Sequence, residues 1–320
     1  MSRHQINEHR SYAAVFDEET RAAVASHPAV ALVERDGIVN IGHQVPIDGE
    51  DMNYEDQRRA WGLVSMSLNW TSGTPLAADG YRFYKDGQGQ GLTAYVVDSG
   101  VRITHGDFEK RAGYGANFVK TEERVDGNGH GTHVAGTIGG KTFGVAKQIN
   151  IISIKVLDKN GNGPMAQTLE GFQWAYQHTR RNKRLNKSLG KYSAGGTGES
   201  SAAMRDAIRE MQKAGMAVFV SAGNDATNIF TIASAGNTLL RARDSNYGKL
   251  VDMFGPGVDI LSCGHKSDKA TARLSGTSQA APHVTGFAKA TVQGISGRVL
   301  RHFLQLSKLS RRSADQETSA

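Results

Sequence analysis

The chain has 320 residues, enough for one large α/β domain with a small appendage, and its 38% hydrophobic and 22% charged residues indicate a soluble globular protein. The 38 basic and 31 acidic residues give a net charge of +7 that is spread along the chain, so we expect no nucleic-acid partner. No apolar run is long enough to cross a membrane, and the single cysteine, Cys263, excludes an internal disulfide framework.

Residues 1–48 form a small unit of their own. A helix is predicted from Asp17 to Ser26, with acids in its first turn, where the helix dipole favours them. Pro28 stops this helix, and the apolar residues 30–34 predict a strand. Residues 49–60 are acidic and poor in apolar groups, which indicates an exposed linker.

From Trp61 onwards, short apolar strands alternate with amphipathic helices. The clearest strands are residues 92–97, 149–156 and 217–220. One helix is predicted over 203–214, and another is marked by Leu169, Phe172 and Tyr176. This alternation predicts a three-layer α/β fold over residues 61–309, with a central, mostly parallel sheet flanked by helices, followed by a polar tail over 310–320.

Two polar residues stand at places where the chain changes structure. Asp98 follows the strand 92–97, at the carboxyl end where ligand crevices form in open sheets. His130 opens a helix of small residues that can pack close to the sheet. His133 lies three residues further on, but helical zinc ligands of the protease type are four apart, so we expect no catalytic metal. Taken alone, Asp98 is as typical of a helix cap, and His130 of a structural histidine.

A third residue, Ser278, lies at the start of a helix after Ser275-Gly276-Thr277. A serine hydroxyl is a poor nucleophile unless a base removes its proton. At the first turn of a helix, Ser278 would point its oxygen outward, and nearby backbone N–H groups could receive an oxyanion. Without partners, the same serine would be interpreted as a helix cap.

The order Asp98, His130 and Ser278, with 32 and 148 residues between successive members, resembles the subtilase family of serine endopeptidases, and within it the proteinase K-like branch. Lesser matches extend the resemblance from about Trp61 to Gly294. It implies that Ser278 attacks the scissile carbonyl, forming an acyl-enzyme, that His130 transfers the proton, and that Asp98 orients the imidazole. No cofactor is implied for catalysis.

The resemblance also implies a substrate site for proteins or peptides, with a broad preference for apolar or aromatic residues before the cut. Asn224 matches the family's oxyanion donor, and the substrate would bind as an added β-strand between two edges. These edges correspond to Gly161 and Gly163 on one side and to Ser188, Leu189 and Gly190 on the other.

Residues 1–48 resemble the second half of the family's inhibitory propeptide, which assists folding, blocks the active site and is cut away. The chain's own propeptide is therefore an expected intramolecular inhibitor, and the cut is expected within residues 50–60. The family implies a secreted, monomeric enzyme. Because the chain carries neither a signal peptide nor the first propeptide half, we expect that its true beginning is missing.

Two segments depart from the family pattern. The polar residues 184–187 stand where the family has a hydrophobic strand, which suggests that a core strand is missing. The loop after Asn224 is also shorter than in the family. In the proteinase K-like branch, the end of this loop helps to bind a structural calcium together with an aspartate that Asp252 matches. These gaps leave an active endopeptidase and a degenerate, inactive subtilase that binds or regulates as alternatives. An unrelated α/β binding protein is a weaker one, because the glycine run 87–91 precedes a strand instead of following it.

Overall fold

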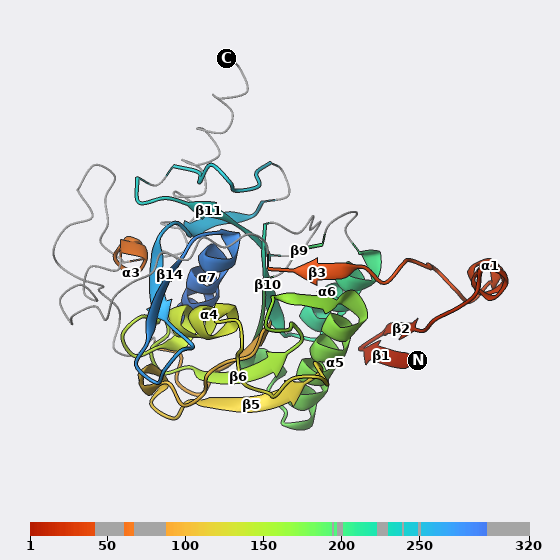
Figure 1. Cartoon of the computed structure of the whole chain (residues 1–320), viewed down its shortest axis with the longest axis horizontal. Helices are drawn as coiled ribbons and strands as arrows, with labels where there is room; N and C mark the ends of the chain where they lie inside the picture. Colours follow the sequence, from red (N-terminus) through yellow and green to blue (C-terminus); the bar gives the residue numbers. More distant parts are fainter. Residues whose placement is uncertain are drawn as a thin grey trace, which may run out of the picture.

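The computed structural model describes residues 1–41, 61–66, 88–193, 195–196, 201–222, 230–238, 240–248 and 251–292. Its centre is a sheet of seven parallel strands in the order β12-β11-β10-β8-β4-β6-β5 (Figure 1). In chain order these are β4 (Thr93–Asp98), β5 (Ala112–Asn117), β6 (Asn150–Lys155), β8 (Ser188–Tyr192), β10 (Ala217–Ser221), β11 (Phe230–Ala235) and β12 (Met253–Pro256).

Strand β4 lies in the interior of this sheet, and all of its residues are buried. Successive side chains of a strand point to opposite faces. Ala94 and Val96 therefore pack in one hydrophobic core, while Tyr95 and Val97 pack in another. Such a continuous apolar run is typical of a parallel strand that is covered by helices on both faces.

Two pairs of helices provide that cover. One core contains residues of α4 (His130–Gly139) and α7 (Thr277–Val292), and the other contains residues of α5 (Met165–Arg181) and α6 (Ala202–Lys213). The predicted three-layer α/β fold is confirmed. The smaller elements of this domain are α3 (Trp61–Ser65), η1 (Gly106–Phe108), η2 (Leu185–Lys187), β13 (Ile260–Cys263) and β14 (Thr271–Leu274). Within the ranges described, no helix is long and apolar enough to cross a bilayer.

The core strand that the polar residues 184–187 suggested to be missing is present. Leu185–Lys187 forms the short helix η2, and β8 begins immediately after it at Ser188. All of β8 is buried, between β4 and β10. The expectation was wrong because the polar stretch connects α5 to the strand, and the strand itself contains a buried lysine, Lys191, that breaks its apolar pattern.

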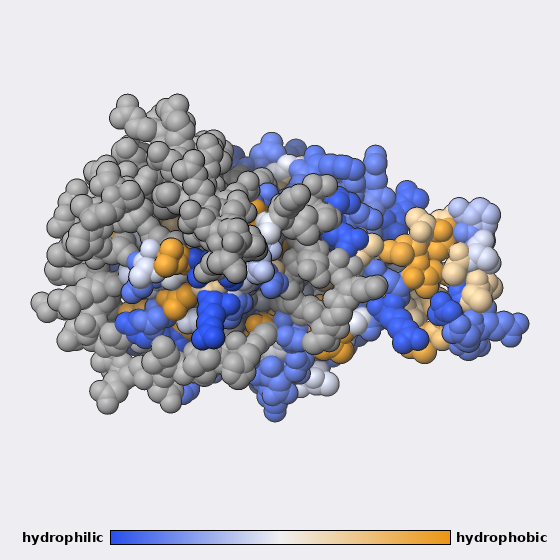
Figure 2. Space-filling view, turned by 90° about the horizontal axis from the view of Figure 1, so that it is seen from above, coloured by the Kyte–Doolittle hydropathy of each residue, from blue (hydrophilic) through white to orange (hydrophobic). Residues whose placement is uncertain are grey.

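The front unit, residues 1–41, packs against α5 and α6 (Figure 1). It consists of a hairpin of β1 (Ser2–Ile6) and β2 (His9–Ala13), the helix α1 (Glu18–Ser26), and the strand β3 (Ile38–Asn40). Helix α1 begins as predicted, because the Asp17 carboxylate accepts the Thr20 N–H at 2.8 Å. Hydrophobic residues gather on the part that protrudes from the body (Figure 2), where Val15 and Leu32 are exposed.

The predicted strand over residues 30–34 is wrong. This stretch is extended but pairs with no strand in the described part of the chain. It is held instead by two acids at helix N-termini. Glu34 accepts the Ser201 hydroxyl and the Ala202 N–H (3.1 Å) at the start of α6, and Asp36 accepts the Ala166 N–H (2.9 Å) at the start of α5. Helix N-termini offer unbonded N–H groups and a positive dipole end, which favour carboxylates.

Gly131 lets α4 approach the end of β4. A Cβ atom at this position would lie 2.0 Å from the Gly100 carbonyl oxygen and 3.2 Å from the Asp98 Cβ. We expect Gly131→Ala to lower the free energy of unfolding by about 1–3 kcal/mol, because one of the two backbones has to move. Urea unfolding measures the loss. Gly113→Ala is the control, since its new Cβ would meet nothing closer than 3.9 Å; equal stability of both variants would contradict the prediction.

Candidate active site

Asp98 and His130 form a buried pair at the carboxyl end of the sheet. Asp98 is the last residue of β4, and His130 is the first residue of α4. The His130 Nδ1 lies 2.7 Å from the Asp98 Oδ1, and the two side chains are 0% and 1% exposed. Asp98 Oδ1 also accepts the Ser99 N–H at 2.7 Å. Because a carboxylate only accepts, Nδ1 is the donor in this hydrogen bond, and Nε2 is the other ring nitrogen.

A second buried aspartate, Asp126, fixes the loop before His130. Its Oδ1 accepts the Gly129 N–H at 2.8 Å and the Ser99 hydroxyl at 2.9 Å. Its Oδ2 accepts the Thr132 N–H at 2.9 Å and the Thr132 hydroxyl at 2.6 Å. The sequence analysis did not single out Asp126, although an aspartate before a glycine-rich turn is a typical acceptor for the following N–H groups. It ties the end of β4 to the start of α4.

Ser278 is the second residue of α7 and is almost fully buried, with 7% exposure. Its hydroxyl donates to the Ser193 carbonyl oxygen at 3.2 Å, and the Ser193 hydroxyl donates to the Ser278 carbonyl oxygen at 3.4 Å. The Ser278 N–H belongs to the first helical turn, which has no intrahelical acceptors. N–H groups at this position can bind a negatively charged oxygen.

The structure joins Asp98 and His130 directly but turns the Ser278 hydroxyl toward Ser193. The His130 Nε2 is buried and has no hydrogen-bond partner within the described residues. Buried polar atoms without a partner are uncommon. Rotation about the Ser278 Cα–Cβ bond moves the hydroxyl between staggered positions. Hydrogen bonds between catalytic groups commonly tighten only when substrate binds. The unpaired Nε2 is the atom that a general base would present.

A three-stranded sheet adjoins Ser193. Its middle strand is β3 of the front unit, which pairs antiparallel with β7 (Asn162–Pro164) on one side and with β9 (Gly195–Gly196) on the other (Figure 1). Val39 pairs with Gly163 and with Gly196, and its side chain is 2% exposed. The front unit therefore places an extended segment between two strand edges of the larger domain.

One of these edges is where the sequence predicted it. Gly163 lies in β7, and Gly161, which has a φ of 79°, lies just before that strand. Gly161 also accepts the Ile41 N–H through its carbonyl oxygen at 3.2 Å. This side of the sheet thus binds an extended chain through its backbone.

The other predicted edge is wrong. Ser188, Leu189 and Gly190 are the first residues of β8, and that strand is already paired with β4 and β10 on its two sides. The register sets Ser188 beside Thr93, at the beginning of β4. Tyr192 pairs with Val97, so Ser193 follows at the end of β4. The strand that pairs with the front unit, β9, comes after Ser193. The tripeptide Ser-Leu-Gly misled the prediction because it resembles the family motif but lies too early in the chain.

Two further predicted site residues stay untested. Asn224 lies outside the described residues. Asp252 accepts the Thr231 N–H at 2.8 Å beside the start of β11. Among the residues that are described, no cluster of three His, Cys, Asp or Glu side chains could hold a metal ion. Because calcium takes about six to eight oxygen ligands, Asp252 alone does not make a site, and calcium binding stays a prediction.

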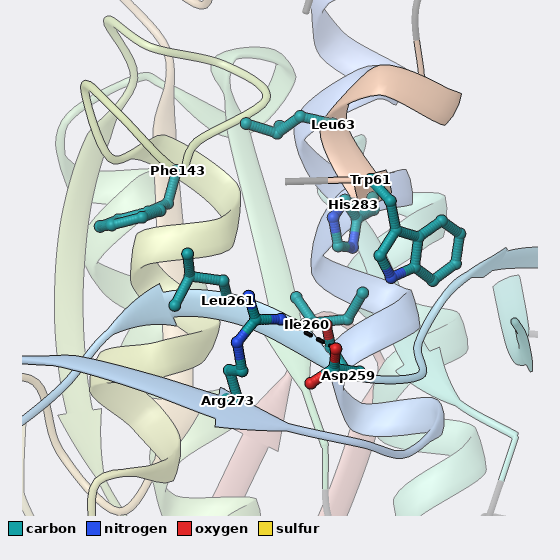
Figure 3. A pocket seen from close by; sticks show the side chains of 9 residues that line it. Trp61, Leu63, Phe143, Asp259, Ile260, Leu261, Arg273 and His283 are labelled. Atoms are coloured by element: carbon teal, nitrogen blue, oxygen red, sulfur yellow. Dashed lines mark hydrogen bonds and ion pairs between the residues drawn. The ribbon is translucent and has the colours of Figure 1, made fainter. Parts of the chain in front are cut away.

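A small pocket between α3, the β13–β14 hairpin and α7 offers no competing site (Figure 3). None of Asp98, His130 and Ser278 lines it. Two of its polar residues form contacts within the fold: the Arg273 guanidinium pairs with the Asp259 carboxylate at 2.9 Å, and the Trp61 indole N–H donates to the Val258 carbonyl oxygen at 2.9 Å. The candidate site therefore remains the one around Asp98.

Two buried histidines beside the site make the fold sensitive to acid. Burial lowers the pKa of His133 to about 3 and that of His283 to about 4, from 6.5 in the unfolded chain. The folded state then binds fewer protons, so stability that is complete above pH 6.5 is lost as the pH falls toward 4. In this window, each histidine lowers the free energy of unfolding by about 1.4 kcal/mol for every pH unit that the pH falls. Urea unfolding between pH 7 and 4.5 measures the slope. His283→Asn should flatten it, and an unchanged slope in that variant would contradict the prediction.

Comparisons with known proteins agree with this geometry. A sequence model described as the subtilase family, Peptidase S8, matches residues 89–316. The chain is 38% identical to subtilisin-like protease 5 of Trichophyton tonsurans, over 97% of this chain and 77% of that protein. It is 36% identical to subtilisin-like protease 1 of Arthroderma benhamiae, over 92% and 73%. The crystal structure of a cold adapted subtilisin-like serine proteinase matches with a TM-score of 0.63 and 33% identity, covering 73% of this chain and 84% of that one.

Proposed function

The chain belongs to the subtilase family of serine endopeptidases, and we propose that it hydrolyses peptide bonds through Ser278, His130 and Asp98. The observation that carries the proposal is the buried Asp98–His130 pair with its unpaired Nε2, at the sheet end where α7 presents Ser278. Because the family chemistry needs no metal or organic cofactor, none is proposed for catalysis.

The reaction begins when the Ser278 Oγ attacks the scissile carbonyl carbon while His130 Nε2 takes the hydroxyl proton. Asp98 stabilises the imidazolium that forms, since its carboxylate already accepts the Nδ1–H. The Ser278 N–H and the side-chain amide of Asn224 would hold the oxyanion. His130 then returns the proton to the leaving amine, which yields the acyl-enzyme. Water then attacks the acyl carbon while His130 Nε2 takes its proton. His130 returns this proton to the Ser278 Oγ as the carboxylic acid is released.

A peptide substrate would bind in the position of β3, by forming backbone hydrogen bonds with β7 and β9. Val39 belongs to the same hydrophobic core as Leu157 and Tyr192, so an apolar substrate side chain at its position would be buried in the same way. This supports a broad preference for apolar or aromatic residues before the cut, although the residues after Ala222 that would line the remaining subsite lie outside the description.

We extend the proposal to residues 1–48 as an intramolecular inhibitor in a secreted, monomeric enzyme. Strand β3 occupies the position that a substrate would need, and the contacts of Glu34 and Asp36 with α6 and α5 anchor the segment that leads to it. An inhibitor of this kind has to be removed before foreign substrates can bind, which makes the chain a zymogen.

The register of β3 suggests where the chain cuts itself. Asn40 pairs with Gly195, and residue numbers run in opposite directions in an antiparallel pair. If this register continued, the second residue after Asn40 would stand opposite Ser193, whose carbonyl oxygen accepts the Ser278 hydroxyl. We therefore predict a cut directly after Gly42, in place of one within 50–60; both positions lie outside the described residues. Intact-mass analysis of the processed protein tests this. A mature N-terminus within 50–60 would contradict it.

A fluorophosphonate probe tests the proposed activity, because it reacts with a serine only when a base has activated it. The unmodified protein should be labelled, the labelled peptide should contain Ser278, and heat-denatured protein should not react. Absence of labelling in folded, processed protein would refute the proposal and favour the alternative hypothesis of an inactive subtilase. That alternative has lost one of its two supports, since β8 is complete.

A further inference from the structure

Lys191 is a buried lysine in the interior of the central sheet. It lies in β8, paired with Val96 of β4 and Phe219 of β10, and it is 1% exposed. Lysine is almost never fully buried unless its ammonium group is paired, because burial of a charge is costly. In the part of the chain that the structure describes, no carboxylate forms an ion pair with Lys191. The fold itself therefore gives no reason for a lysine here.

The partners of the ammonium group lead directly to Ser278. Lys191 Nζ donates to the Tyr192 carbonyl oxygen at 2.9 Å and to the Ser193 hydroxyl oxygen. Ser193 in turn is bonded to Ser278 twice, through its hydroxyl to the Ser278 carbonyl oxygen and through its own carbonyl oxygen to the Ser278 hydroxyl. Lys191, Ser193 and Ser278 form one continuous set of hydrogen bonds.

The Asp98–His130 pair lies near the same group. Burial lowers the pKa of Lys191 to about 7, and the negative charge of Asp98 opposes that shift. Lys191 pairs with Val96, two residues before Asp98 on the neighbouring strand β4, so the two side chains lie on the same face of the sheet.

We propose that Lys191 is a positioning residue for Ser278: its buried amino group fixes Ser193, and Ser193 holds the first turn of α7, which carries the Ser278 hydroxyl. This inference rests on the proposed function. It concerns a residue that contacts neither substrate nor oxyanion, and it assigns a role to a side chain whose burial the fold does not otherwise explain.

Lys191→Met separates positioning from support of the fold. Methionine has a similar length and no charge, and replacement of a buried charge by an apolar side chain is often neutral or stabilising. We expect the variant to unfold at the same or a higher urea concentration, with kcat lowered by about 10- to 100-fold and KM changed less than about twofold. Labelling by the fluorophosphonate probe, which does not need the strand edges, should slow by the same factor as kcat.

Lys155 provides the matched control. It is also fully buried, but its ammonium group pairs with Glu122 at 3.1 Å and donates to the Ser99 carbonyl oxygen at 2.7 Å. Lys155→Met removes the charge that pairs with Glu122 and the donor to the Ser99 carbonyl oxygen, so this variant should lose stability, in contrast to Lys191→Met. A lysine that only supports the fold would behave like Lys155.

A double-mutant cycle with Ser193→Ala tests the route. If Lys191 acts through the Ser193 hydroxyl, Ser193→Ala should lower kcat alone, and the double variant should be no slower than the slower single variant. Three results would each overturn the inference. The two substitutions could lower kcat by factors that multiply in the double variant. Lys191→Met could have a normal kcat and labelling rate, or it could lose stability and kcat together. Failure of the unmodified protein to react with the probe would instead refute the proposed function, so the two failures are distinguishable.

Discussion

Replacing Ser278 with alanine is expected to lower kcat by about 10⁶, which is the loss known for subtilisin when its own nucleophile is removed and not a value measured on this chain. The proposed reaction requires a covalent bond to the Ser278 Oγ, and no other group on α7 takes its place. The structural cost should be small. Within the described residues, the hydroxyl forms one hydrogen bond, to the Ser193 carbonyl oxygen, and this bond is worth about 1 kcal/mol.

Three measurements check this result: peptide hydrolysis, fluorophosphonate labelling and urea unfolding. The Ser278→Ala protein should also keep its front unit, because it cannot cut itself. Ser267→Ala, at an exposed serine, is the control and should behave as the unmodified enzyme. Hydrolysis that survives in purified Ser278→Ala protein at more than about one part in 10³ would assign the activity to another nucleophile.

Asp98→Asn should produce the second largest loss, about 10⁴ in kcat, by analogy with the same change in other Ser-His-Asp enzymes. Asparagine keeps the shape of the side chain, and its oxygen can still accept the His130 Nδ1–H. It removes the negative charge that stabilises the imidazolium, and its amide can turn an N–H group toward Nδ1, which moves the imidazole proton to Nε2. Either change weakens His130 as a base.

The loss should appear in kcat while KM stays nearly constant, because Asp98 is buried beneath His130 and cannot reach a bound peptide. Asp206→Asn is the matched control. Asp206 is exposed on α6, and its partner among the described residues is Arg209 at 3.2 Å, so kcat should stay within about twofold. If the two variants had equal activity, Asp98 would be only a structural residue.

The elements that could be predicted from sequence were those with strong local signals. The strand that ends at Asp98 has four apolar or aromatic residues in a row, 94–97, and the helix of Ala207, Ile208 and Met211 repeats its apolar residues at the helical spacing. The motifs around His130 and Ser278 named the family because each has an unusual composition. Such features need no information about what lies across the fold.

The elements that could not be predicted depend on partners distant in sequence. Residues 30–34 have the composition of a strand, yet none of the described strands pairs with them. The three residues of β3 are too short a run to predict a strand, and they form one because two edges flank them. Whether the predicted substrate edge begins at Ser188 or after Ser193 depends on the register of β8 against β4, which a single sequence does not reveal.

The position of β3 as the middle strand of its sheet has a consequence for how activity would be released. While the front unit is tethered to the larger domain, it acts at a high effective concentration that does not depend on how much protein is present. Once the tether is cut, the same segment becomes a separate ligand whose occupancy falls on dilution. A processed preparation should therefore gain specific activity when it is diluted, whereas the uncut chain should stay blocked at any dilution.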